Sequence, residues 1–300
     1  MVDANPERES APGLIPPGAT LRSTQRLKKA FVRQDSIEKM LVLIPGSKSL
    51  GKWCSEVEAA AATENWGVTV KIVVYTPPAV WWVAIWPPQL RRNRQIRRQL
   101  DQLLDTAAKH EAEVFIAAHS YGTHALIKYL RRFLPSRQDV DRTHRLTPRI
   151  NAIFLINGIA KRKHLAEIRP MRNLLINDVA SFDNVPLYAA GLATPLAPCW
   201  NPYDDIGTRG VQSGAAEAHD RFFPGDHGTL VTVDHFRSHI LPVLYGDELP
   251  PGTAADQTTN MPVLSLPRLR RIRTVLSILG YTALAVLIGW AIWSWPFWPF

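Results

Sequence analysis

The feature that most restricts the fold of this chain is a repeated alternation of short apolar runs with segments of helical periodicity. The apolar runs have the length of strands and lie at residues 40–46, 68–75, 113–119, 150–158 and 185–191. Apolar residues recur at helical spacing at residues 50–65, 96–107, 123–134 and 228–244. Continuous apolar strands are typical of a parallel sheet covered by helices on both faces. We therefore predict an α/β fold with a mostly parallel central sheet, in which reactive residues lie at the carboxyl ends of strands.

The composition supports a sizeable folded body and excludes two classes of chain. With 46% hydrophobic and 20% charged residues, the sequence is too apolar for an intrinsically disordered chain. The two cysteines, Cys54 and Cys199, are too few for a disulfide scaffold, and neither has a second Cys or a His at metal-ligand spacing. The formal net charge of +9 is compatible with binding either to nucleic acid or to an anionic membrane surface. The position of the basic residues along the chain distinguishes these two partners.

The carboxyl-terminal segment has the composition of a membrane anchor. Residues 274–300 carry no charged side chain, and a spanning helix needs about 20 apolar residues. Indole rings favour the headgroup level, and tryptophans gather at the far end: Trp290, Trp293, Trp295 and Trp298. Arginines directly precede the segment: Arg268, Arg270, Arg271 and Arg273. The positive-inside rule then predicts a single-pass anchor with the body of the protein in the cytoplasm. A buried core helix is the alternative, and the length of the uncharged stretch disfavours it.

Four parts of the chain are predicted. Residues 1–35 form a disordered, partly basic leader that lacks the apolar core of a secretory signal. Residues 36–248 form the folded body, and residues 249–267 form a linker rich in Pro, Thr and Ala. Residues 268–300 form the basic flank and the membrane anchor.

Ser120 lies between the predicted strand at 113–119 and the predicted helix at 123–134, in the sequence Ala118-His119-Ser120-Tyr121-Gly122. A serine on a sharp strand-to-helix turn needs small residues two positions before and two positions after it, because strand and helix pass closely there. Ala118 and Gly122 meet that requirement. The alternative is a serine that only caps the helix.

This motif and its setting resemble the α/β-hydrolase family, over residues 40–245. The sequence AHSYG is similar to that family's nucleophile elbow, G-H-S-x-G, with Ala118 in place of the first glycine. The resemblance implies an α/β-hydrolase fold and a serine hydrolase of the esterase or lipase kind. In that family the acid and then the histidine follow the serine along the chain.

The resemblance also implies the partners of Ser120. The family's general base lies in a loop before the last helix, which matches His227 in FFPGDHGTL; His219 is the rival. The acid follows the penultimate strand, taken here as 185–191, and often precedes x-[IV]. That pattern matches Asp204, with Asp205 as the alternative acid. His227 would take the serine proton, and the acid would orient the imidazole.

The loop after the first strand supplies part of the oxyanion hole in the same family. The implied donors are the backbone N–H groups of Tyr121 and Ser47, although Pro45 replaces the family's usual histidine. The same stretch, from Gly46 to Lys52, is close to a phosphate-binding loop, G-x-x-x-x-G-K-[ST]. Trp53 occupies the position of the Mg²⁺-binding Ser or Thr, so nucleotide binding is the less favoured interpretation.

Two further patterns in the sequence bear on the binding of a metal, a nucleic acid or a membrane. His235 and His239 are four residues apart, but Phe236 stands where a zinc protease has Glu, so no metal site is expected. The basic segment 91–100 lacks interleaved aromatic residues, so no nucleic-acid partner is expected and a solvated helix face is favoured. Tryptophans just before it suit a membrane-surface element or a cap over the active site: Trp81, Trp82 and Trp86.

The sequence therefore predicts a membrane-tethered serine hydrolase that cleaves a carboxylic ester or thioester without a cofactor. A lipid or other acyl ester is the favoured substrate, on the basis of the tether and the Trp-rich segment. The alternative from another class is a membrane-anchored interaction module on the same fold, without turnover.

Overall fold

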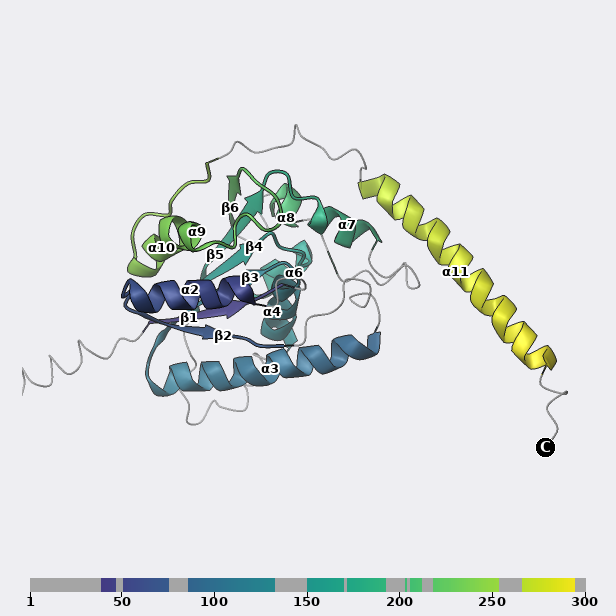
Figure 1. The fold of residues 1–300 in the computed structure, drawn as a ribbon, viewed down its shortest axis with the longest axis horizontal. Coiled ribbons are helices and arrows are strands. Elements are labelled where there is room, and N and C mark those ends of the chain that lie inside the picture. The colour runs from purple at the N-terminus through teal and green to yellow at the C-terminus, as the bar shows by residue number, and fades with distance from the viewer. Residues whose placement is uncertain are drawn as a thin grey trace, which may run out of the picture. The chain divides into compact units, whose positions relative to one another are not determined.

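A computed structural model of the chain describes residues 39–46, 51–75, 86–132, 150–169, 172–192, 203, 206–211, 218–253 and 266–294 (Figure 1). Its strands are β1 (Lys39–Ile44), β2 (Val68–Ile72), β3 (Glu113–His119), β4 (Ile150–Ile156), β5 (Arg172–Ala180) and β6 (Ala218–Phe223). Its helices are α2 (Lys52–Thr63), α3 (Trp86–Lys109), α4 (Tyr121–Arg132), α6 (Arg162–Glu167), α7 (Val185–Leu192), α8 (Ile206–Arg209), α9 (Val233–His235), the π-helical turn η4 (Phe236–Ile240), α10 (Leu241–Tyr245) and α11 (Leu266–Ser294).

The six strands form one sheet in the order β2-β1-β3-β4-β5-β6, and every neighbouring pair is parallel. The prediction of a parallel central sheet is confirmed. Strand β3 lies in the middle, between β1 and β4, and nearly all of its side chains are buried. Burial on both faces of the sheet explains why a central strand such as β3 appears in the sequence as a nearly unbroken apolar run.

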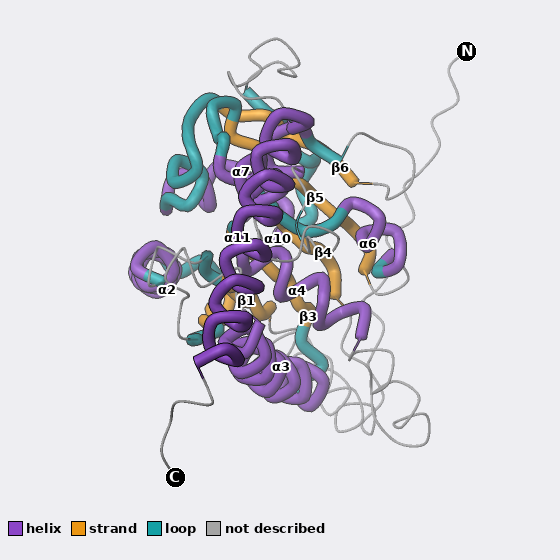
Figure 2. Tube along the Cα trace, turned by 90° about the vertical axis from the view of Figure 1, so that its right-hand side faces the viewer, coloured by secondary structure: helices purple, strands orange, loops and turns teal. Residues whose placement is uncertain are grey.

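Helices cover both faces of the sheet, and alternate residues of one strand serve the two faces (Figure 2). Val42 and Ile44 of β1 pack into the core under α3 and α4, whereas Leu41 and Leu43 pack into the core under α2, η4 and α10. This period of two is what a pleated strand imposes. The apolar stripes of α3 and α4 supply one core, with Ile96, Leu100, Leu104, Leu126 and Leu130. The other core contains Trp53, Val57, Phe236, Ile240 and Leu244.

The sequence-based assignment was wrong in the second half of the sheet. Residues 185–191, predicted as a strand, belong to helix α7, while the true strands β5 and β6 were not identified. Pro186 is tolerated in the first turn of α7, where its missing N–H has no helical partner to lose. Strand β5 reads RNLLINDVA, and its buried polar residues Asn177 and Asp178 broke the apolar pattern that marks the other strands.

The polar residues of β5 are buried because each finds partners there. The guanidinium of Arg221 on β6 donates two hydrogen bonds of 2.7 Å to the carboxylate of Asp178, and Nε2 of His235 lies 3.0 Å from the same carboxylate. Asn177 donates to the carbonyl oxygen of Ile206 and to Asp220. His235, one of the two histidines spaced four residues apart, is buried and part of this network.

Asp178→Asn should lower the free energy of unfolding by about 3–5 kcal/mol, because it leaves the buried charge of Arg221 without its counter-ion. Burial opposes ionisation of Asp178, but hydrogen bonds from His235 and the charge of Arg221 hold the pKa of Asp178 below its usual value. A pKa lowered by folding stabilises the folded chain above about pH 4, and that contribution is lost as the pH falls. The free energy of unfolding of Asp178→Asn should therefore fall less on acidification than that of the native chain.

Urea unfolding of the detergent-solubilised chain between pH 3 and pH 7 measures both effects. Arg237→Met is the matched control, because Arg237 pairs with Glu64 and Asp234 on the surface and should contribute at most about 1 kcal/mol. Equal losses in the two variants would contradict the role given to the buried pair.

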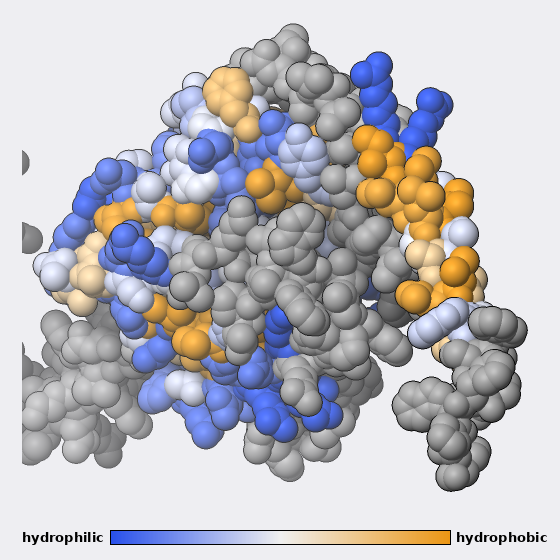
Figure 3. Space-filling model, turned by 45° about the vertical axis from the view of Figure 1, so that its right-hand side comes forward, coloured by the Kyte–Doolittle hydropathy of each residue, from blue (hydrophilic) through white to orange (hydrophobic). Residues whose placement is uncertain are grey.

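The carboxyl-terminal helix α11 carries an apolar surface that is exposed in the described structure. Thr274–Ala291 has a mean hydropathy of 1.8 and is the one segment of the described residues that is long and apolar enough to cross a membrane. Its exposed large apolar residues are Val275, Leu276, Ile278, Leu279, Val286, Leu287, Ile288 and Trp290, and Figure 3 shows such side chains gathered in orange. Most of the predicted linker lies outside the described residues, but its start packs on β6, where Pro250 accepts a hydrogen bond from Arg221.

Candidate active site

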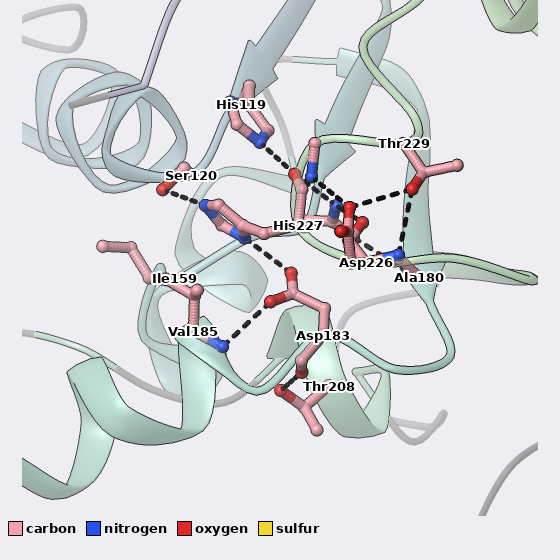
Figure 4. A network of polar contacts seen from close by, with 12 residues as sticks. His119, Ser120, Ile159, Ala180, Asp183, Val185, Thr208, Asp226, His227 and Thr229 are labelled. Carbon is pink, nitrogen blue, oxygen red and sulfur yellow. Dashed lines mark hydrogen bonds and ion pairs between the residues drawn. The ribbon is translucent and has the colours of Figure 1, made fainter. Parts of the chain in front are cut away.

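Three side chains meet beyond the carboxyl ends of three strands of the sheet (Figure 4). Ser120 directly follows β3, Asp183 follows β5 and His227 follows β6. Parallel strands bring all their carboxyl ends to one edge of the sheet, so residues far apart in the sequence converge there. The site is therefore a consequence of the topology.

Ser120 occupies a strained turn between β3 and α4. Its φ angle is +51°, a left-handed conformation that a non-glycine residue rarely adopts. The backbone N–H of Ser120 donates to Ile156 O at 3.0 Å. Its carbonyl oxygen accepts hydrogen bonds from the N–H and the hydroxyl of Thr123, at 3.0 and 2.6 Å. These bonds hold the serine in its strained conformation at the start of the helix.

The small residues around Ser120 are required by close backbone contacts. A Cβ atom on Gly122 would lie 2.6 Å from the carbonyl oxygen of Ile44 and 2.8 Å from that of Pro45, so only glycine fits. A Cβ atom on Gly46 would lie 2.9 Å from Cβ of Ser120. The loop after β1 therefore passes directly beside the serine, as an oxyanion loop would.

His227 links the serine to a buried carboxylate. Nε2 of His227 lies 2.9 Å from Oγ of Ser120, and Nδ1 lies 2.6 Å from Oδ2 of Asp183. Because a carboxylate only accepts, Nδ1–H donates to Asp183, which leaves Nε2 free to accept the serine hydroxyl proton. The serine hydroxyl thus contacts the imidazole, an arrangement that can activate a nucleophile.

Hydrogen bonds hold both the side chain and the backbone of Asp183 in place. Its Oδ1 accepts a hydrogen bond of 2.9 Å from the N–H of Val185 at the start of α7, and its carbonyl oxygen accepts one of 2.8 Å from the Thr208 hydroxyl. Burial raises the pKa of Asp183, and the hydrogen bond and charge of His227 act against that rise. A buried carboxylate of this kind orients an imidazole and stabilises its charged form.

The backbone of His227 is fixed by two side chains that sequence reasoning did not assign. Its carbonyl oxygen accepts hydrogen bonds from Nε2 of His119, at 2.9 Å, and from Nδ2 of Asn157, at 3.0 Å. Burial, followed by the charge of His227, lowers the pKa of His119 to about 3. His119 therefore stays neutral in neutral solution and donates from Nε2. Asn157 also accepts from the N–H of Ala180, so it ties the histidine loop to the end of β5.

Asn157→Ala should lower kcat by about 10- to 100-fold, because the histidine loop loses one of its two anchors and the geometry of His227 relaxes. The substitution should also cost about 1–3 kcal/mol of folding free energy, since the buried N–H of Ala180 loses its acceptor. Steady-state kinetics and urea unfolding measure the two effects. An unchanged kcat beside a lowered stability would show that Asn157 is structural only.

Among the described residues, the carboxylate that hydrogen-bonds to His227 is that of Asp183, whereas the sequence predicted Asp204 or Asp205. Both predicted residues lie outside the described residues, and the hydrogen-bonding position at Nδ1 is held by Asp183. The cause is the misassigned strand. The predicted strand at 185–191 places the acid in the loop that follows it, whereas the penultimate strand of the structure, β5, ends at Ala180. Asp183 lies in the short turn between β5 and α7.

The predicted oxyanion donors are only partly described. Tyr121 is the first residue of α4, so its N–H is one of the helix-terminal donors without an intrahelical partner. Ser47 lies outside the described residues, as do Trp81 and Trp82. Trp86 is the first residue of α3. The described part of the first loop is anchored by Tyr75, whose hydroxyl donates to Pro45 O.

The competing interpretations of the site find no support among the described residues. Lys52, the lysine of the phosphate-loop pattern, points into solvent toward Glu56, and its side chain is 86% exposed. Trp53 packs into the core against Phe236. His219 is an exposed residue of β6, so it is not the base beside Ser120. No group of three metal-ligating side chains occurs in the described ranges.

Comparisons with known proteins add little to this geometry. No protein-family model matches the chain, and no curated protein matches it. Among solved structures, a "predicted CIB-like hydrolase" from Thermoplasma acidophilum is 12% identical, with a TM-score of 0.44, covering 71% of this chain and 88% of its own. The carboxylesterase Cest-2923 from Lactobacillus plantarum is 12% identical, with a TM-score of 0.41, covering 85% and 86%. A peroxisomal alpha-beta-hydrolase from Saccharomyces cerevisiae is 10% identical, with a TM-score of 0.40, covering 85% and 88%. Similarities this low establish neither a family nor an activity.

Proposed function

We propose that this protein is a serine hydrolase that cleaves carboxylic esters or thioesters through an acyl-enzyme. The observation that carries the proposal is the continuous chain of hydrogen bonds from Oγ of Ser120 through His227 to the buried carboxylate of Asp183. A serine hydroxyl is a weak nucleophile, and this arrangement supplies the adjacent base and the orienting acid that it needs.

In the proposed first half-reaction, Oγ of Ser120 bonds to the carbonyl carbon while Nε2 of His227 takes the hydroxyl proton. The electron pair of the carbonyl bond moves to oxygen, where the N–H of Tyr121 stabilises the negative charge. When the carbonyl reforms, the alcohol or thiol leaves with the proton from His227. A water molecule, deprotonated by His227, then releases the acid and restores Ser120.

Hydrolysis of p-nitrophenyl esters of increasing acyl length by the full detergent-solubilised chain tests this proposal. We expect a burst of p-nitrophenol followed by slower turnover, because the ester acylates Ser120 before water releases the acid. Turnover of at least one chain length, with Ser55→Ala on the exposed face of α2 as an unaffected control, is the supporting result. Absence of cleavage at every length would favour an interaction module that uses the same fold without turnover.

We further propose that α11 anchors the protein in a membrane, with the folded body on the cytoplasmic side. Support comes from the exposed apolar surface of Thr274–Ala291 and from the arginines that precede it. The full chain should stay with membranes during alkaline carbonate extraction, whereas a chain ending at residue 253 should move to the soluble fraction. Release of the full chain by carbonate would contradict the anchor.

A further inference from the structure

A buried group of aromatic residues surrounds one arginine beside Ser120, and the proposed chemistry leaves that arginine without a role. We call this group the Arg92 cluster; it consists of Tyr75, Arg92, Tyr121 and Tyr203. All four residues are more than nine-tenths buried. The rings of Tyr75 and Tyr121 are 6.2 Å apart, and His124 bridges Tyr121 and Tyr203 at centroid distances of 5.9 and 5.0 Å.

The cluster holds a positive charge next to neutral phenols. Burial is the main cause of a raised pKa for each of the three tyrosines, to about 12 for Tyr121, so the phenols stay protonated in neutral solution. The guanidinium of Arg92 acts against that rise in all three cases, and for Tyr121 it also does so through a hydrogen bond. Arginine keeps its charge throughout the pH range in which proteins are folded.

The charge of Arg92 has no counter-ion among the described residues. Its Nη1 is buried without a hydrogen-bond partner, and the guanidinium lies within hydrogen-bonding reach of the Tyr121 hydroxyl. A buried cation is strongly unfavourable unless a carboxylate or another anion pairs with it. A buried guanidinium with an unpartnered N–H group, beside a phenol hydroxyl, is a donor set that can bind an anionic oxygen group from outside the protein.

The cluster is connected to the nucleophile through Tyr121 and through the loop after β1. Tyr121 follows Ser120 in the chain, and its N–H is the proposed oxyanion donor. The hydroxyl of Tyr75 holds the carbonyl of Pro45, and the next residue, Gly46, passes beside Ser120. Tyr121 therefore links Arg92 to the nucleophile and to the proposed oxyanion donor.

We propose that Arg92, with the hydroxyl of Tyr121, binds an anionic group carried by the substrate, a carboxylate or a phosphate. This inference rests on the proposed hydrolase function and narrows its substrate to esters that bear such a group. Arg92 is then a specificity-determining residue, and the neutral phenols around it exclude water and leave the guanidinium available to the substrate.

A pair of esters of equal chain length tests the inference: p-nitrophenyl valerate, which is neutral, and mono-p-nitrophenyl glutarate, which ends in a carboxylate. The native chain should have the higher kcat/KM for the glutarate. Arg92→Met should lower kcat/KM for the glutarate by about 10- to 100-fold and change that for the valerate by less than about threefold. Arg94→Met, an exposed arginine on the same helix, should leave both unchanged.

Inorganic phosphate separates the two anions. Competitive inhibition of valerate hydrolysis by phosphate, lost in Arg92→Met, would assign the site to phosphate even if the glutarate is not preferred. Equal kcat/KM values for the two esters in the native chain and in Arg92→Met, without phosphate inhibition, would overturn the inference and leave the hydrolase proposal standing. Cleavage of neither ester would instead count against the hydrolase proposal.

Asp204 and Asp205 follow Tyr203 in the sequence and provide an internal control. If Asp204→Asn with Asp205→Asn lowered glutarate hydrolysis as much as Arg92→Met, a carboxylate of the chain would be paired with Arg92, which would overturn the inference. We expect the double substitution to leave the preference for the glutarate unchanged.

Discussion

Replacing Ser120 with Ala should lower kcat for ester hydrolysis by about 10⁴-fold or more, because the proposed acyl-enzyme forms on the hydroxyl of Ser120. The hydroxyl of Ser120 contacts Nε2 of His227, so its loss removes the nucleophile without leaving a buried charge unpaired. Initial rates with the best p-nitrophenyl ester measure the effect, and Ser55→Ala serves as the control on a solvent-exposed helix face.

The stability of the Ser120→Ala variant should be near that of the native chain or above it. The serine sits at a φ angle of +51°, where any non-glycine side chain is strained, so alanine adds no new strain. A fall in kcat of less than tenfold in a folded variant would show that hydrolysis does not proceed through Ser120.

Asp183→Asn should lower kcat by about 10⁴-fold, whereas Asp204→Asn and Asp205→Asn should each change it by less than about threefold. The asparagine oxygen can still accept the hydrogen bond from Val185 that starts α7, so the local backbone is preserved. The amide group, however, donates toward Nδ1 of His227 and forces the ring proton onto Nε2. The imidazole then cannot accept the proton of Ser120.

The comparison among the three asparagine variants decides which carboxylate orients His227. A urea-unfolding transition close to that of the native chain shows that each variant is folded. A large loss of kcat in Asp204→Asn or Asp205→Asn, with Asp183→Asn near the native rate, would contradict the assignment of Asp183 and restore the assignment made from the sequence.

Much of the first half of the fold could be predicted from the sequence because its central strands are buried mainly by apolar contacts. Strands β1, β3 and β4 appear as mostly apolar runs, and the small residues around Ser120 follow from close backbone contacts at Ile44 and Pro45. These are local patterns with a steric cause, and local patterns can be recognised in a single sequence.

The acid could not be found in the same way, because β5 is stabilised by partners distant in the sequence. Its Asp178 is buried only because Arg221 and His235 reach it from β6 and α9. When that strand is not recognised, nothing in the sequence marks the turn that contains Asp183 as the position of the acid. The anchoring of His227 by His119 and Asn157 likewise joins the ends of three strands, and no local pattern indicates it.

The buried Arg92 was overlooked for a different reason. The overall charge of segment 91–100 predicts a solvated helix face. Arg94, Arg97 and Arg98 are indeed exposed. Arg92, however, precedes the buried Ile96 by four residues, so it lies on the same stripe of α3 that packs on the sheet. Helical spacing, applied to charged residues as well as to apolar ones, would have singled it out.

Mass spectrometry of the full chain after reaction with a fluorophosphonate probe tests the central claim most directly. The account predicts one covalent adduct per chain, located on Ser120, and a greatly slowed reaction in His227→Ala because the serine loses its base. An adduct on another residue, or labelling of Ser120 at an equal rate without His227, would contradict the proposed catalytic arrangement.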